Sequence, residues 1–248
     1  MAPRLKPLVD IDNTLHDSEK FATMARQNAI SAMQSAGLKG DFASLEGVLE
    51  GIIEQNTSNN PRHFDDMLIA VGVKDRSERS RLVQKARRAY HDTKIGILRP
   101  YPDVPLALYR LKVEKGYDMY IASDGYGVQQ WEKVDRMGLE PFFNRLAFIT
   151  KDYMYEIQDC QKNEAFFKLI INRLGILGSD AVMIDDNPAV LDSAKKVGLY
   201  TIRILRGKFS QINFKADYAI QNFEPLPDIL DELNAKVEEA NLQRRNPD

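Results

Sequence analysis

The sequence contains a single cysteine, Cys160, among its 248 residues. One cysteine cannot form a disulfide bond within the chain, which is typical of proteins from a reducing compartment. No histidine lies near Cys160 in the sequence, so the pattern favours a bystander thiol over a nucleophile activated by a histidine.

Long apolar runs and an excess of positive charge are also absent. No run approaches the length of a membrane-spanning helix, and residues 1–6 lack the apolar segment of a signal peptide, so we expect a cytoplasmic protein without a membrane partner. The 34 Lys and Arg residues stand against 36 Asp and Glu, a net charge of −2. Because binding to phosphate backbones requires a basic face, we expect no nucleic-acid partner.

The residues that are present predict a sheet interrupted by a helical lobe. A short apolar strand ends at Asp10, and from about residue 19 to residue 90 the apolar spacing is helical, with no convincing strand. A helical insert of about 80 residues is too long for a connection, so it should be a separate lobe. We predict an α/β core made of 1–16 and 97–248, and a helical domain at 17–96.

After Tyr101 the sequence alternates between strand and helix patterns. Strands are expected near 118–123, 146–150, 181–184 and 200–205, with a possible edge strand at 216–220, and helices between them. This order predicts a Rossmann-like parallel sheet with helices on both faces. The tail from Asn234 onward is polar, and we expect it to fray.

Carboxylates follow two of these predicted strands. Asp10 and Asp12 end the first strand, and Asp185 and Asp186 end the fourth. The carboxyl ends of parallel strands share one edge, where ligands bind in open α/β sheets. Clustered carboxylates repel one another unless a cation lies between them, and oxygen ligands suit Mg²⁺. The alternative is that these aspartates only end strands, open turns and cap a helix.

A hydroxyl and a lysine complement these acids. Ser123 ends the second predicted strand, and the backbone amides around Gly125 can hold a phosphate group. Lys162, just before the helix that starts at Asn163, is the best-placed cation to balance the acids. Ser123 could instead be a turn-forming serine.

Together these residues resemble the four sequence motifs of the haloacid dehalogenase (HAD) superfamily of phosphohydrolases, over essentially the whole chain. The motifs are Asp10-x-Asp12-x-Thr14, Ser123, Lys162 and Asp185-Asp186. The helical insert resembles the cap of subfamily I. The segments 99–104, 122–125 and 130–133 resemble the archaeal branch of glyceraldehyde 3-phosphate phosphatases.

The resemblance implies a role for each motif residue. Asp10 would be the nucleophile that forms an aspartyl-phosphate, and Asp12 the general acid and base. Mg²⁺ would be bound by Asp10, the backbone carbonyl of Asp12 and Asp186, with Asp185 as a supporting or alternative ligand. The implied substrate-binding residues are Thr14, Ser123, Asp124 and Lys162.

Two positions remain open. Many relatives follow the motif lysine with prolines, whereas Asn163 and Glu164 follow Lys162 here, so Lys151 is an alternative to Lys162. His16, at the predicted hinge, could contact substrate or be a solvated residue.

The predicted function is a Mg²⁺-dependent phosphomonoester hydrolase for a small phosphorylated metabolite, such as glyceraldehyde 3-phosphate or another sugar or polyol phosphate. Two alternatives are a phosphomutase on the same scaffold and a non-catalytic phospho-accepting signalling or binding protein. A dehalogenase is disfavoured, because a halide leaves without the proton that Asp12 would supply.

Overall fold

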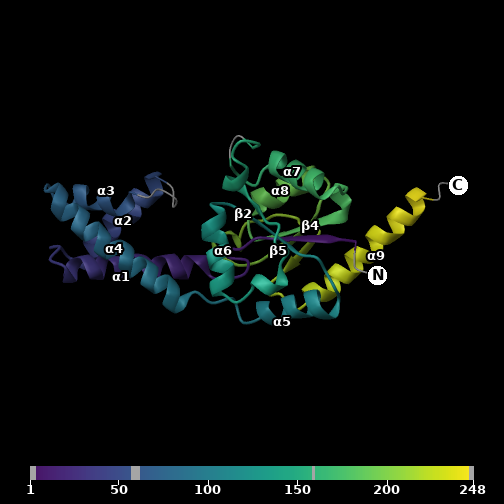
Figure 1. The fold of residues 1–248 in the computed structure, drawn as a ribbon, viewed down its shortest axis with the longest axis horizontal. Helices are drawn as coiled ribbons and strands as arrows, with labels where there is room; N and C mark the ends of the chain where they lie inside the picture. Colours follow the sequence, from purple (N-terminus) through teal and green to yellow (C-terminus); the bar gives the residue numbers. More distant parts are fainter. Residues whose placement is uncertain (1–3, 57–61, 158–159, 246–248) are drawn as a thin grey trace. The chain divides into compact units, whose positions relative to one another are not determined.

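The computed structural model describes residues 4–56, 62–157 and 160–245 (Figure 1). The chain divides into two compact units. One unit joins Met1–Asp17 to Arg99–Asp248, and the other is Ser18–Leu98. The first unit contains the sheet and the second is helical. The role of the helical unit as a cap stays a prediction. No helix within the described residues is both long and apolar enough to span a bilayer.

The first unit is built on a six-stranded parallel sheet with the strand order β3-β2-β1-β4-β5-β6. Its strands are β1 (Lys6–Val9), β2 (Tyr120–Ser123), β3 (Phe148–Ile149), β4 (Ala181–Asp185), β5 (Tyr200–Ile204) and β6 (Tyr218–Ile220). The parallel α/β fold predicted from the sequence is confirmed, although the third strand is only two residues long.

The strand order places β1 at the centre of the sheet. From β1 the chain adds β2 and β3 on one side, then returns to add β4, β5 and β6 on the other. The order therefore reverses at β1, and a crevice at the carboxyl ends of the strands is expected at such a reversal. The central strands are apolar almost throughout because both of their faces are covered; in β1, Leu8 and Val9 are fully buried.

Helices flank the sheet, with α7 and α8 on one side and α5 on the other (Figure 1). The core helices are α5 (Val104–Tyr109), α6 (Gly127–Arg136), α7 (Glu164–Leu174), α8 (Pro188–Lys196) and α9 (Leu226–Arg245). Local signals fix the ends of α7. The Asn163 side chain accepts a hydrogen bond from Phe166 N at its start, and Gly175 adopts a left-handed conformation at its end.

The second unit consists of α1 (Ser18–Ser35), α2 (Phe42–Asn56), α3 (His63–Ala70) and α4 (Arg76–Ile97). These helices enclose an apolar core of their own, to which all four contribute: Ile30, Met33, Leu45, Leu49, Met67, Leu68 and Leu82. The N-terminus of α4 is capped by Asp75, whose side chain accepts a hydrogen bond from Glu78 N.

The expectation that the tail frays from Asn234 onward is wrong for residues 234–245; residues 246–248 lie outside the described part of the chain. Helix α9 continues to Arg245, and Leu230, Leu233 and Val237 on one of its faces are buried. The Asn234 side-chain oxygen accepts hydrogen bonds from the backbone amides of Arg4 and Leu5, just before β1. Apolar residues at helical spacing therefore outweigh the polar composition of this segment.

We predict that the packing of α9 contributes measurably to stability. Leu230 is fully buried, and Leu230→Ala should lower the free energy of unfolding by about 2–5 kcal/mol, because it removes buried methyl groups and leaves a cavity. Leu242 on the same helix is 61% exposed, so Leu242→Ala is the matched control. Urea denaturation of both variants measures the difference. Equal stability of the two variants would contradict the packing described here.

Candidate active site

The carboxyl ends of three neighbouring strands bring the predicted residues together. Asp10 directly follows β1, and its backbone amide donates a hydrogen bond to Ile184 O of β4 over 3.0 Å. Ser123 is the last residue of β2, and Asp185 is the last residue of β4. Because the three strands are adjacent and parallel, these residues share one edge of the sheet.

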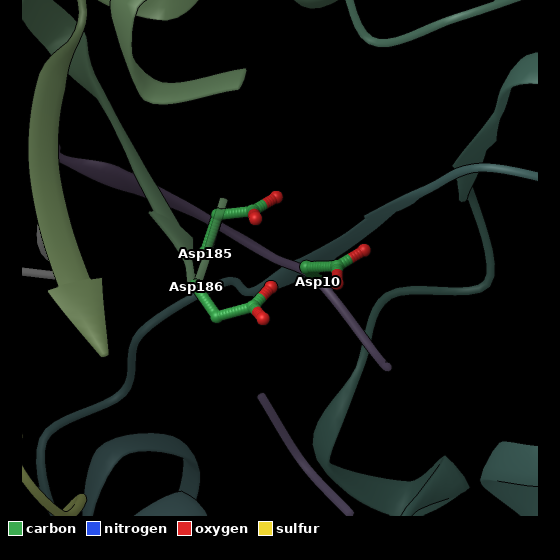
Figure 2. A group of neighbouring side chains, drawn as sticks. All are labelled: Asp10, Asp185 and Asp186. Carbon is green, nitrogen blue, oxygen red and sulfur yellow. The ribbon is translucent and has the colours of Figure 1, made fainter. Parts of the chain in front are cut away.

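Three carboxylates gather at the ends of β1 and β4 (Figure 2). One oxygen from each of Asp10, Asp185 and Asp186 lies within 4.8 Å of the other two. All three residues are buried, with at most 4% of their surface exposed. Three acids this close form an oxygen-rich set of the kind that binds a divalent cation.

Lys162 lies among these acids. Its Nζ donates hydrogen bonds of 2.6 Å to Asp10 Oδ1 and 2.6 Å to Asp185 Oδ2, in a buried position. Its backbone amide donates to Asp124 Oδ1 over 3.2 Å. Lys151 instead places its Nζ 6.0 Å from the centre of the Tyr126 ring. The geometry therefore favours Lys162 over Lys151 as the motif lysine.

One lysine does not balance three buried carboxylates. Burial raises the pKa of Asp10 and of Asp185, although the ammonium group of Lys162 opposes the rise. Burial and the nearby Asp10 raise the pKa of Asp186 to about 7. Burial would lower the pKa of Lys162, but the Asp10 and Asp185 carboxylates raise it above its usual value. The set therefore carries negative charge that a cation would stabilise.

The Asp186 side chain supplies a second sign of a cation site. Its Oδ2 atom is buried and has no hydrogen-bond partner among the residues that the structure describes. A buried, unpaired carboxylate oxygen is costly unless it has a ligand. The donor set therefore fits a divalent metal with oxygen ligands, such as Mg²⁺.

Asp12 lies outside this cluster, and its carboxylate contacts the side-chain nitrogens of Lys133 and His16. Lys133 Nζ, on α6, donates to both carboxylate oxygens over 2.7 Å, and His16 Nε2 lies 2.9 Å from Oδ1. Since an ionised carboxylate only accepts, Nε2 of His16 carries the proton. Burial alone would raise the pKa of Asp12, but Lys133 and His16 hold it well below its usual value. The Asp12 side chain is 39% exposed, so it remains accessible.

The loop after β1 is shaped by its neighbours in the same unit. Asn13 has a positive φ of 57°, and Leu15 N donates to Ile11 O over 2.9 Å. Arg206, after β5, donates to Thr14 O over 2.9 Å and stacks 3.9 Å above the Tyr101 ring. A Cβ atom on Gly207 would lie 2.6 Å from the side-chain nitrogen Nδ2 of Asn13, and Gly207 has a φ of 60°, so both features favour glycine at this position.

The remaining predicted residues lie near the site with contacts of their own. The side chain of Ser123 is buried, and Thr14 is fully buried with an Oγ1 that has no partner among the described residues. Asp124 accepts the Lys162 backbone amide, and its own carbonyl accepts the Gln130 side-chain amide. Gly125 N donates to Thr150 Oγ1 over 3.2 Å, so this amide is already engaged within the protein.

Lys133 and Arg206 were missed from the sequence. The segment 130–133 contributes only to the family resemblance, and no local sequence pattern singles out Lys133, because its partner Asp12 is 121 residues away. No sequence pattern marks Arg206, because its partners come from segments about 100 and 190 residues away.

The helical unit, which contains none of these residues, has a groove of about 650 Å³ of its own. Its lining includes Asp65 of α3, Arg62 just before α3, and four arginines of α4: Arg76, Arg79, Arg87 and Arg88. Its least exposed arginine, Arg79, already bonds Asp65 and the carbonyls of Val73 and Lys74. The positive charge of the groove is therefore partly neutralised by Asp65, which is part of its lining.

The profile of the haloacid dehalogenase-like hydrolases matches residues 8–198. The chain belongs to this family. A glyceraldehyde 3-phosphate phosphatase of Methanopyrus kandleri is 36% identical over 220 residues, 88% of this chain and 91% of the relative. The corresponding phosphatase of Methanocaldococcus jannaschii is 34% identical over 230 residues, 91% of this chain and 96% of the relative. The chain is thus a HAD hydrolase homologous to these phosphatases.

Solved structures of the family share the fold. A HAD hydrolase of Bacillus subtilis bound to magnesium superposes with a TM-score of 0.66 at 19% identity, covering 93% of this chain and all of the other. A 2-haloacid dehalogenase of Pseudomonas syringae gives 0.63 at 19% identity, covering 94% and 99%. Because each of these proteins is only 19% identical to this chain, the likeness establishes the fold, and the activity has to be argued from the site.

We predict that the HAD hydrolase depends on Lys162 and tolerates loss of Lys151. Lys162→Met keeps most of the aliphatic chain but removes the charge beside Asp10, so hydrolysis of p-nitrophenyl phosphate should fall by about 10²–10³-fold. Lys151→Met is the matched control and should retain wild-type turnover. The reverse order of activities would assign the motif lysine to Lys151.

Proposed function

We propose that the chain is a Mg²⁺-dependent phosphomonoesterase that acts on a small phosphorylated metabolite through an aspartyl-phosphate on Asp10. The observation that carries the proposal is the meeting of Asp10, Lys162, Asp185 and Asp186 at one buried edge of the sheet. Support comes from relatives more than 30% identical along most of the chain, which are glyceraldehyde 3-phosphate phosphatases. Glyceraldehyde 3-phosphate or another sugar or polyol phosphate is the proposed substrate.

In the first step a carboxylate oxygen of Asp10 attacks phosphorus, and the bond from phosphorus to the ester oxygen breaks. Asp12 gives its proton to the departing oxygen, so the alcohol leaves neutral. Lys162, held against Asp10, orients the nucleophile and balances charge on the transferring group. Ser123, at the end of β2, would hold a phosphoryl oxygen, with Thr14 and Asp124 supporting the two loops around it.

In the second step water cleaves the aspartyl-phosphate. Asp12, now ionised, takes a proton from the water as its oxygen attacks phosphorus, and the bond to Asp10 breaks. Inorganic phosphate leaves, Asp10 is a carboxylate again, and the proton from the water has passed to Asp12. The ion-paired Asp12 of this structure corresponds to the form that this step needs.

The residues around the reacting groups are also suited to bind a divalent cation. Asp10 and Asp186 would bind Mg²⁺ together with the Asp12 backbone carbonyl, and Asp185 would orient Lys162 or serve as a further ligand. When bound, Mg²⁺ offsets the repulsion between the Asp10 carboxylate and the phosphate dianion and stabilises the transition-state charge.

The nucleophile is tested by Asp10→Asn. This change removes the attacking carboxylate, so phosphate release from glyceraldehyde 3-phosphate should fall to background while the circular dichroism spectrum stays that of the folded protein. Wild-type protein should release phosphate without any bisphosphate activator, since a phosphomutase would need one. Activity retained by the Asp10→Asn protein would contradict the mechanism.

The cation requirement is tested by chelation. Activity should disappear in excess EDTA and return on addition of Mg²⁺, because the buried acids otherwise repel the phosphate dianion. Thermal denaturation gives a second readout, since a cation that binds the folded state alone raises the melting temperature. Activity and melting temperature that are both indifferent to EDTA would exclude a metal at this site.

A further inference from the structure

Helix α6 presents two polar side chains to the candidate site from one face. Gln130 and Lys133 are three residues apart, which places them side by side on a helix. The Gln130 side-chain amide donates to the carbonyl of Asp124 in the loop after β2. Lys133 reaches Asp12 in the loop after β1. The helix therefore links the two loops that carry the proposed phosphate-binding serine and the proposed acid.

The contact between Lys133 and Asp12 restricts the orientation of the Asp12 carboxylate. Lys133 Nζ donates to both carboxylate oxygens over equal distances of 2.7 Å, so rotation of the carboxylate about its last bond breaks a contact. His16 Nε2 adds a third contact at 2.9 Å on Oδ1. An exposed aspartate in a loop would otherwise sample several rotamers.

The ion pair is partly shielded from water while the acid stays reachable. The Lys133 side chain is only 17% exposed, whereas the Asp12 side chain is 39% exposed. Shielding strengthens a charge-assisted hydrogen bond, so this pair differs from ordinary surface ion pairs such as Glu132 with Arg136 on the same helix. Asp12 is therefore fixed on one side and open on another.

We propose that Lys133 is a positioning residue for Asp12, holding its carboxylate where it exchanges a proton with the leaving alcohol and with the attacking water. The inference rests on the proposed function and assigns Lys133 a part in it. Lys133 acts through Asp12 and touches neither substrate nor phosphate. His16 supports the same carboxylate from within the loop after β1.

A positioning role differs from a merely structural one in its dependence on the leaving group. The alkoxide of glyceraldehyde 3-phosphate needs a proton as it departs, whereas p-nitrophenolate is a stable anion that departs without one. Loss of Lys133 should therefore slow phosphorylation of Asp10 by the first substrate much more than by the second. Damage to the fold would slow both equally.

The test measures the first turnover by rapid quench for wild type, Lys133→Met, Lys133→Arg and the control Arg136→Met. In Lys133→Met, phosphorylation by glyceraldehyde 3-phosphate should fall about 100-fold, while phosphorylation by p-nitrophenyl phosphate changes by less than about threefold. Lys133→Arg keeps two donors for the carboxylate and should restore most of the lost rate. Arg136→Met should match wild type on both substrates.

Other outcomes separate the two proposals. If wild type is active, and Lys133→Met loses both reactions equally or loses neither, the positioning role is overturned while the phosphatase stands. Failure of Lys133→Arg to recover any of the rate lost with glyceraldehyde 3-phosphate would also overturn the role. If wild type hydrolyses neither substrate in the presence of Mg²⁺, the proposed function itself is overturned.

Discussion

The candidate site depends on one buried interaction, the Lys162 ammonium group between the carboxylates of Asp10 and Asp185. Burying any of these charges alone would cost several kcal/mol, so each is retained only in the presence of the others. The arrangement still leaves an excess of negative charge, which is seen in the raised pKa of Asp186 and in its Oδ2 atom, for which the described residues supply no hydrogen-bond partner. A bound divalent cation would offset this excess of negative charge, and a phosphate group can bind next to the cation.

The rest of the catalytic unit holds that interaction in place. The central position of β1 sets Asp10 beside the end of β4, and the capped start of α7 fixes the segment that carries Lys162. The loop after β1 is held from two further directions, by Arg206 bonding Thr14 O and by Lys133 bonding Asp12. The chemistry proposed for Asp10 and Asp12 thus uses groups that secondary structure and long-range contacts restrain.

Much of this could be predicted from the sequence, because it follows from local patterns. Apolar strands ending in acids, and the alternation of strand and helix, were sufficient for the fold class and for the residues that gather at the sheet edge. Register favoured Lys162 but left Lys151 as an alternative, since the segment after Lys162 departs from the usual motif and both lysines precede α7. Helix α9 was missed because polar composition was weighed above its buried apolar spacing. Lys133 was missed because its partner is 121 residues away.

The most direct test of the buried site is anomalous diffraction from crystals grown with Mn²⁺, which takes oxygen ligands as Mg²⁺ does and scatters anomalously. We expect an anomalous peak within coordination distance of the Asp10 and Asp186 carboxylates, with Lys162 still bonded to Asp10. Crystals that contain Mn²⁺ but show no peak at these acids, or a Lys162 side chain turned away from Asp10, would contradict it.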